Sequence, residues 1–193
     1  MLILFNKPFN VLCQFTDKDG RKTLSDFIKI KNVYAAGRLD YDSEGLVVLT
    51  DDGKLQKKIS DPENKMEKSY LVQIEGIPTE TDLEKLRKGI KLKDGITKSA
   101  KVKIIDDPKV WERNPPIRER KNIPTSWLEL KIYEGRNRQV RKMFEQYGYF
   151  VRELERTEYA GLKCGDLKKG DWRKLSADEV KSLYKHSGLE QAK

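Results

Sequence analysis

The chain has one histidine and two cysteines among its 193 residues, and these shortages exclude several kinds of active site. His186 lies near the C-terminus, so a Ser-His-Asp or Cys-His triad would have to use a residue of the tail, and a zinc site would lack ligands. Cys13 and Cys164 lie far apart without a Cys-x-x-Cys pattern, which favours two packing residues in a reducing cytoplasm. Any catalysis must therefore rely on carboxylate, lysine, arginine, tyrosine or serine.

The sequence also lacks a long apolar run and a nucleotide-binding glycine motif. No run approaches the roughly 20 apolar residues that cross a bilayer. The apolar start, residues 1–5, ends at Asn6-Lys7-Pro8 and predicts a first buried strand, because it has neither the charged start nor the length of a signal peptide. Neither Gly-x-Gly-x-x-Gly nor a P-loop is present. We therefore expect a cytoplasmic protein without membrane contact, cofactor or metal.

What the sequence has in excess is positive charge. Lysine and arginine number 40 against 31 aspartates and glutamates, which gives a net charge of +9. The hydrophobic and charged fractions are both 37%, which is typical of a folded protein with a heavily solvated surface. A basic surface displaces counterions from phosphates, so this balance favours a nucleic-acid partner. The length suffices for one substantial domain.

The order of apolar patterns predicts an α+β fold. Strands are expected at residues 2–5, 33–36, 46–50, 69–75, 100–105 and 127–133, and helices at residues 23–28, 81–90, 138–147 and 177–185. Because strands and helices do not alternate strictly, we expect a mixed, largely antiparallel sheet with flanking helices and a central cleft. A breaker-rich stretch at residues 60–64 divides the predicted domain, residues 1–186, into a small lobe (1–60) and a larger one (61–186). A frayed tail is expected at residues 187–193.

Residues 108–124 form a long segment with four prolines and no periodicity. Arg113, Arg118, Arg120 and Lys121 make it basic. A structureless loop of this length in a compact domain is disordered or functional. Two interpretations stay open, an ordered RNA-contacting loop and a solvated excursion.

An acidic turn at residues 40–44 follows one apolar strand and precedes another. Asp40, Asp42 and Glu44 could cap backbone amides of the turn. A calcium loop is excluded, because an apolar run follows Gly45, helices do not flank the loop, and the last ligand position, Asp51, is not glutamate. A lone catalytic carboxylate is the third interpretation, since a loop at a strand edge is the usual place for one. Arg38, two residues before Asp40, could contact a phosphate or a flanking base.

Five motifs in order connect the chain to a known family. The first is Gly-Arg-Leu-Asp-x-x-Ser-Glu-Gly-Leu-x-x-Leu-Thr at residues 37–50, which resembles the signature of the RsuA-type ribosomal RNA pseudouridine synthases. Asn6-Lys7-Pro8, residues 68–72 (KSYLV), 134–143 (EGRNRQVRKM) and 165–173 (GDLKKGDWR) match further family motifs. Together the matches span about residues 2–185.

The resemblance implies a partner and a reaction. Because the sequence starts at the expected catalytic strand, we expect no S4-type domain, although such a domain is common in the family. With residues 113–121 and 123–127, this start resembles the branch that modifies 23S rRNA at uridine 2457. The implied activity is isomerisation of that uridine to pseudouridine, without a cofactor. The implied partner is 23S rRNA, without DNA or an obligate protein partner.

The resemblance also implies residue roles, with Asp40 as the essential carboxylate, either nucleophile or base. Tyr70 occupies the family position for stacking on a flipped base, and Arg141 the position that pairs with Asp40. Apart from the family, residues 136–142 hold four cations and no acid. On a helix Arg138, Arg141 and Lys142 would project away from the apolar stripe and suit phosphate or carboxylate. The predicted substrate-binding residues are Arg38, Tyr70, Arg136, Arg138, Arg141 and Leu154.

Two rival functions remain open from the residues alone. A non-catalytic RNA-binding module would be expected to lose Asp40, which is present. A carboxylate hydrolase would need a second positioned acid, for which Asp42 is the nearby candidate. Lys7 is a possible Schiff-base lysine, but Lys-Pro after a buried strand favours a structural or phosphate role.

Overall fold

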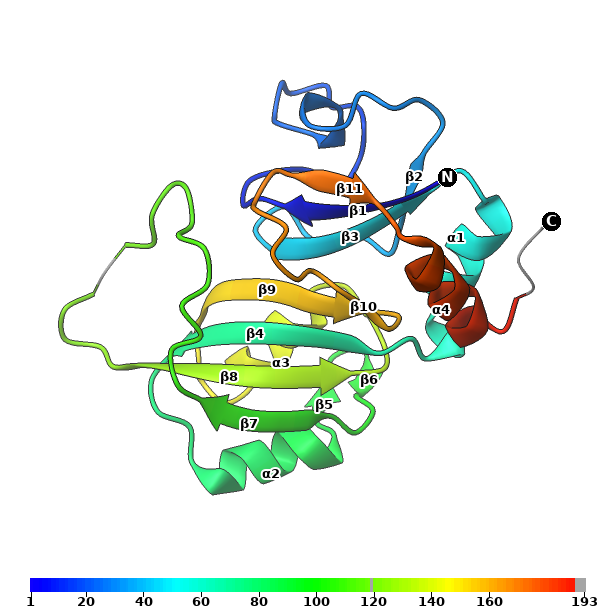
Figure 1. Cartoon of the computed structure of the whole chain (residues 1–193). Coiled ribbons are helices and arrows are strands. Elements are labelled where there is room, and N and C mark those ends of the chain that lie inside the picture. The colour runs from blue at the N-terminus through cyan, green and yellow to red at the C-terminus, as the bar shows by residue number, and fades with distance from the viewer. Residues whose placement is uncertain (119, 190–193) are drawn as a thin grey trace.

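One mixed, largely antiparallel sheet runs through the computed structural model, which describes residues 1–118 and 120–189 (Figure 1). Its strands are β1 (Leu2–Lys7), β2 (Tyr34–Ala36), β3 (Glu44–Thr50), β4 (Lys68–Glu75), β7 (Lys101–Ile105), β8 (Thr125–Ile132), β9 (Val151–Tyr159), β10 (Leu162–Lys163) and β11 (Trp172–Lys174). The strand order is β11-β1-β3-β9-β4-β8-β7, with β2 beside β3 and β10 beside β9. A separate small hairpin joins β5 (Lys91–Leu92) to β6 (Gly95–Ile96). The predicted α+β class and its mixed sheet are confirmed.

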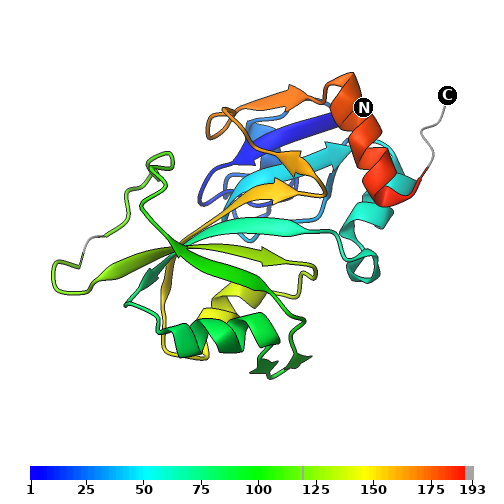
Figure 2. The ribbon, with the colours of Figure 1, turned by 60° about the horizontal axis from the view of Figure 1, so that its bottom comes forward.

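One face of this sheet carries one 3-10 turn and two helices. The 3-10 turn η1 (Leu24–Asp26) packs near β1, and α2 (Glu80–Lys88) and α3 (Gln139–Glu145) pack on the β4–β8 half (Figure 2). A single apolar cluster joins Phe5, Val47, Val72, Leu83 and Phe144 across both halves. The helix predicted at residues 23–28 is only this one turn.

The opposite face is covered beside β1 and β3 by α1 (Gly53–Ser60) and α4 (Ala177–Ser187). Leu4 and Val48 of the sheet pack there with Leu55 of α1 and Leu183 of α4. Capping explains where the helices begin: Asp52 accepts from the first amides of α1, and Ser176 forms a capping box with Glu179 at α4. No described helix has the length and apolar character that a membrane crossing requires.

The two halves of the sheet meet where β3 pairs with β9. This pairing is parallel and short, with Glu44 opposite Glu155 and Gly45 opposite Arg156. The 3-10 turn η2 (Pro62–Asn64) lies in the predicted hinge and leads into β4. Although the sequence assigns residues 61–186 to the larger lobe, β11 pairs with β1 and α4 packs with α1. Of the predicted tail, residue 187 ends α4, and residues 190–193 lie outside the described residues.

Candidate active site

A cleft of about 580 Å³ opens between the two halves of the sheet. It is bounded by the loop between β2 and β3, by β4 and β9, and by the chain that enters α3. The cleft brings together six of the seven predicted site residues, which are Arg38, Asp40, Tyr70, Arg136, Arg138 and Leu154. The seventh, Arg141, lies behind the loop that carries Asp40.

Two glycines fix the loop that carries Asp40. Gly37 has φ +87°, and a Cβ there would lie 2.3 Å from the Tyr159 hydroxyl. Gly45 has φ +104°, and a Cβ there would lie 2.3 Å from the Arg156 carbonyl oxygen. Only glycine permits both the left-handed backbone and this close approach to β9. The loop is therefore held against β9 at both ends, and between them the Asp40 side chain is 36% exposed in the cleft.

Asp42, two residues further, holds two arginines that enter or belong to α3. Arg138 Nη1 and Nη2 donate to its Oδ1 and Oδ2 at 2.8 and 2.9 Å. Arg141 Nε lies 3.4 Å from Asp42 Oδ2, and its Nη2 donates to the Asp42 carbonyl at 2.6 Å. Burial opposes ionisation of Asp42, but the hydrogen bonds from Arg138 and the charge of Arg141 outweigh it and lower the pKa of this carboxyl.

The expected pairing of Arg141 with Asp40 is not what the side chains show. Arg141 is buried, and its Nη1 donates to the Val151 carbonyl at 3.2 Å, so it joins α3 to β9 and to the turn at residue 42. The cation that lies near Asp40 is Arg138, with Nη1 at 3.9 Å from Oδ2. The helical periodicity placed Arg141 on the solvent face. The fold buries it because the β2–β3 loop and β9 pack on that side of α3.

Tyr70 and Leu154 form the apolar wall of the cleft. Tyr70 on β4 lies opposite Arg156 of β9, and Leu154 precedes Arg156 on the same face of β9. Both side chains are buried in the protein core except where they line the cleft. Burial raises the pKa of Tyr70, so its phenol stays uncharged at neutral pH.

Arg156 is a cleft residue that the sequence did not single out. It is 1% exposed, and its Nε donates to the Leu46 carbonyl at 2.8 Å and its Nη2 to the Gly37 carbonyl at 3.0 Å. Its guanidinium lies 4.3 Å from the centre of the Tyr159 ring. No carboxylate in the described part of the chain lies within 4.0 Å of it, so its charge is balanced by carbonyl dipoles and an aromatic face.

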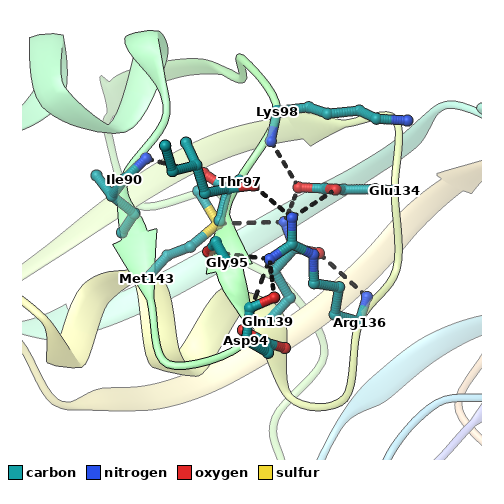
Figure 3. A network of polar contacts seen from close by, with 10 residues as sticks. Ile90, Asp94, Gly95, Thr97, Lys98, Glu134, Arg136, Gln139 and Met143 are labelled. Atoms are coloured by element: carbon teal, nitrogen blue, oxygen red, sulfur yellow. Dashed lines mark hydrogen bonds and ion pairs between the residues drawn. The ribbon is translucent and has the colours of Figure 1, made fainter.

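Arg136 lines the cleft, but its guanidinium is engaged in contacts with other parts of the protein. Nη1 donates to the carbonyl of Gly95 at 3.1 Å, and Nη2 donates to that of Ile96 and lies 3.4 Å from a Glu134 carboxylate oxygen. Figure 3 shows the side chain directed into the β5–β6 hairpin, where Gln139 also joins Glu134. Arg136 thus fastens the hairpin to the entrance of α3.

Comparisons with known proteins agree with this geometry. A family model described as RNA pseudouridylate synthase matches residues 1–146. The ribosomal large subunit pseudouridine synthase E of Vibrio parahaemolyticus is 58% identical over 174 residues, 90% of this chain and 73% of the relative. The protein of the same name from Xanthomonas axonopodis is 48% identical over 90% of this chain and 87% of its own. A crystal structure of a pseudouridylate synthase matches with TM-score 0.79 and 31% identity, over 94% of this chain and 73% of that chain.

The chain belongs to the RNA pseudouridylate synthase family. It is therefore an isomerase that acts on RNA, as the ordered motifs indicate. A carboxylate hydrolase would need Asp42 as its second acid. In this enzyme Asp42 is instead bound to two arginines, which argues against that alternative.

The ammonium group of Lys7 is surrounded by backbone carbonyls, as in a residue with a structural role. Its Nζ donates to the carbonyls of Pro8, Val11 and Tyr41 at 2.8, 2.7 and 3.4 Å, and it does not line the cleft. Burial lowers its pKa to about 8. These contacts tie the chain after β1 to the turn at residue 41, which agrees with the structural role preferred for Lys7 over a Schiff base.

A buried acidic cluster lies on the face of β3 and β9 that is turned away from the cleft. Lys169 Nζ lies 3.4 Å from a Glu44 oxygen and 3.1 Å from a Glu155 oxygen. Glu153 lies close by, with a buried oxygen that has no hydrogen-bond partner. Burial, followed by the charges of Glu44 and Glu155, raises the pKa of Glu153 to about 7. Lys169 holds the chain before β11 against the seam, which is the short parallel pairing of β3 with β9.

Residues 106–118 and 120–124 form a long excursion between β7 and β8 (Figure 1). Arg113 lies 4.1 Å from the centre of the Phe9 ring and donates to the Arg152 carbonyl at 3.2 Å. Arg152 in turn donates to the carbonyl of Arg118 at 2.8 Å. These contacts tie part of the excursion to β9 and to the loop after β1, beside the turn that carries Asp42.

Proposed function

We propose that the enzyme converts one uridine of 23S rRNA to pseudouridine, with Asp40 as its essential carboxylate. The relatives named as ribosomal large subunit pseudouridine synthases support a large-subunit substrate. The branch that residues 113–121 and 123–127 resemble supports uridine 2457 as the target. A cytoplasmic location, where ribosomal RNA is made accessible to such an enzyme, belongs to the same proposal.

The observation that supports the proposal best is the position of the Asp40 carboxylate and its lack of hydrogen bonds from the described residues. It lies in the cleft between the two halves of the sheet, and no side chain or amide of the described residues donates a hydrogen bond to it. A carboxylate with free lone pairs can attack the ribose as a nucleophile or remove a ribose proton as a base. Isomerisation then breaks the glycosidic C–N bond, rotates the base and rejoins it to the ribose through carbon.

The walls of the cleft suit a base that has left its stack. A stacked uracil is out of reach, so the uridine must be flipped into the cleft at a cost of a few kcal/mol. Stacking on an aromatic face offsets about 1–3 kcal/mol of that cost. We assign the aromatic face to Tyr70 and the opposing apolar wall to Leu154, which line the cleft together with Asp40.

Phosphate contacts complete the substrate site. Arg38 is exposed at the cleft beside Asp40, and Arg138 is partly exposed at the entrance of α3. The basic excursion, with Arg113 and Arg118, lies on the same side as the Asp42 turn. The net charge of +9 supports a long RNA contact, whose affinity falls as salt rises.

Asp40→Asn tests the proposal, because it keeps the side-chain size and removes the ionised carboxylate. We expect no pseudouridine at the target position when the variant is incubated with 23S rRNA from cells lacking the enzyme. Asp19→Asn is the control, an exposed aspartate paired with Arg21 outside the cleft lining, and should modify that position fully. Pseudouridine formation by Asp40→Asn at the native rate would refute the assignment. Modification by the native enzyme at another uridine would refute position 2457 alone.

A further inference from the structure

Lys68 is a cation of the cleft that the proposed reaction does not yet use. Strand β4 places Lys68 and Tyr70 two residues apart on the same face, and both side chains line the cleft. Lys68 is half-buried, and one of its three N–H donors reaches the carbonyl of Met66 at 2.9 Å. Within residues 1–118 and 120–189, no carboxylate oxygen lies within 4.0 Å of its Nζ. The ammonium group therefore has donors left for a molecule that enters the cleft.

A bulge in β9 brings a second cation to the same aromatic ring. Tyr159 lies opposite Lys68 and Arg156 opposite Tyr70, so between these pairs β9 has one residue more than β4, Thr157. This extra residue lets Arg156 and Tyr159 both line the cleft, although they are three residues apart. Lys68 Nζ lies 5.3 Å from the centre of the Tyr159 ring, and the Arg156 guanidinium lies 4.3 Å from it. The cleft therefore holds two positive charges beside one ring.

The positive charge of Lys68 is poorly compensated. Burial, followed by the charge of Arg156, lowers the pKa of Lys68 to about 8. Glu134, just before α3, acts against this shift, but its carboxylate already accepts from the Lys98 amide and the Gln139 side chain. A negatively charged oxygen next to the ammonium group would stabilise it. The position of Lys68 therefore suits an anionic group of the substrate.

The reaction itself produces such a group. When the glycosidic C–N bond breaks, its electron pair stays with the uracil, and the negative charge spreads over the two carbonyl oxygens of the ring. A uracil stacked on Tyr70 has an edge near Lys68, because the two side chains are neighbours on one face of β4. We propose that Lys68 is a further catalytic residue, whose ammonium group donates to a carbonyl oxygen of the flipped uracil and stabilises its charge as the C–N bond breaks.

Lys68 gives up no proton in this step. When the ring rejoins the ribose through C5, the C5 proton leaves and N1 gains one, so the base is neutral again. The inference rests on the proposed function, since it needs a uridine in the cleft.

A phosphate of the RNA backbone is the other anion available, and it fits the position less well. Its charge is the same before and during the reaction, so a contact with it would strengthen binding without accelerating the chemical step. Phosphate is also strongly hydrated, whereas the Tyr159 ring beside the ammonium group is fully buried. A fixed donor in such a dry place stabilises most a charge that develops in the transition state.

Lys68→Met tests the proposal through a split between rate and affinity, because methionine keeps the apolar stem and removes the ammonium group. At saturating 23S rRNA we expect the single-turnover rate to fall about 10- to 100-fold. This is less than the roughly 100- to 1000-fold loss of one donor to an oxyanion, because the uracil charge is shared by two oxygens. The RNA dissociation constant should stay close to the native value. A native rate would overturn the proposal, whether binding stays native or weakens as expected of a phosphate contact.

The pH profile distinguishes a charge on the substrate from a role in the fold. Because kcat/KM reports groups of the free enzyme, it should decline in the native enzyme as the pH rises through about 8, where Lys68 loses its proton. Arginine stays charged, so Lys68→Arg should keep part of the rate and lose this decline. Tyr159, which faces Lys68, has its pKa raised to about 12 and stays uncharged, and Lys7, with its pKa lowered to about 8, is present in both proteins. The same decline in Lys68→Arg would contradict the assignment.

Lys131→Met is the matched control. Lys131 on β8 is half-buried like Lys68 and lies opposite Ser69, so its side chain is on the other face of the sheet. Its Nζ lies 3.6 Å from a Glu67 oxygen and 3.5 Å from a Glu158 oxygen. With the folded fraction of each variant measured in urea, Lys131→Met should show the native rate per folded molecule and the native affinity. A loss like that of Lys68→Met would count against a specific role for Lys68.

Asp40→Asn on the same RNA separates the two ideas. An active Asp40→Asn refutes the proposed function, whereas an inactive Asp40→Asn with a native Lys68→Met rate refutes the role of Lys68 alone.

Discussion

The two faces of the sheet at the β3–β9 seam carry opposite surpluses of charge. On the cleft face, Arg156 is buried without a carboxylate partner, and it contacts carbonyl oxygens and Tyr159 instead. On the other face, Glu44, Glu153 and Glu155 gather around Lys169. The cation on the cleft face lines the cleft, whereas the acids on the other face are buried by the enzyme's own chain.

The register of two strands creates this difference. Glu44 lies opposite Glu155 and Gly45 opposite Arg156, and neighbouring residues on a strand point to opposite faces. One step along the pair therefore exchanges an acidic environment for a basic one. Gly45 is needed on the cleft side, because any side chain there would collide with the Arg156 backbone. The seam that joins the two halves of the enzyme thus also sets the sign of the field on each face.

The largest effect is expected from Arg156→Met. The substitution removes the Arg156 donors from the carbonyls of Leu46 and Gly37, at about 1–3 kcal/mol for the buried Leu46 carbonyl and less for the partly buried Gly37 carbonyl. Gly37 begins the loop that carries Asp40, and a misplacement of about 1 Å at a reacting group costs on the order of 100-fold in rate. We expect a loss of about 100-fold in single-turnover rate together with lower stability in urea unfolding.

Arg156→Lys sharpens this prediction by keeping the charge. An ammonium lacks the planar fork that reaches both carbonyls, so it should recover part of the stability but little of the rate. If Arg156→Met were as active as the native enzyme, the surplus cation on the cleft face would have no part in placing the Asp40 loop.

A smaller and different effect is expected from Lys169→Met on the acidic face. Removal of the lysine leaves Glu44 and Glu155 as buried carboxylates without their cation, which should cost about 3 kcal/mol in the free energy of unfolding. Lys163→Met, which breaks an exposed pair with Glu158, is the control and should cost less than about 1 kcal/mol. Urea unfolding measures both. Rate per folded molecule should stay native in Lys169→Met; a selective loss of rate would place this face in the active site.

Much of the fold could be predicted from apolar periodicity, but the pairing of β3 with β9 at the seam could not. The strands at β1, β3, β4, β7 and β8 have the alternating or continuous apolar patterns that a buried sheet imposes. Strand β9 was not predicted, because its centre reads Glu153-Leu154-Glu155-Arg156 and resembles a solvated segment. Its charged residues are buried through contacts with Lys169, and with Leu46 and Gly37, which lie more than 100 residues away. Helix α1 was also missed, since only Leu55 and Ile59 are buried in a short and mostly polar segment.

Six of the seven predicted site residues line one cleft, whereas two of their contacts in the structure were not predicted. The motif order indicated the loop at Asp40 and the strand at Tyr70, and both line the cleft. The pairing of Arg141 with Asp40, which the family resemblance implied, differs from the structure, where Arg141 lies beside Asp42, because a motif match does not tell which of two nearby acids a guanidinium reaches. The role of Arg136 in the β5–β6 hairpin depends on carbonyls about 40 residues away, which no local pattern contains.

The last effect is a dependence of stability on pH that is expected from the acidic face between pH 5 and 8. Glu153 has its pKa raised from 4.5 to about 7, so between these values the folded enzyme keeps a proton that the unfolded chain has released. Stability must then fall as the pH rises through this window and level off above it, by up to about 3 kcal/mol. Glu153→Gln cannot titrate and should remove this decline from the free energy of unfolding measured in urea at pH 5 to 8. Glu158→Gln on the same strand is the control, because cationic neighbours and a Ser69 hydrogen bond lower the pKa of Glu158 despite partial burial, so its titration lies below the window. An unchanged decline in Glu153→Gln would show that the proton is held by Glu44, whose pKa burial also raises, and not by Glu153, the one acid of the cluster without an ion pair to Lys169.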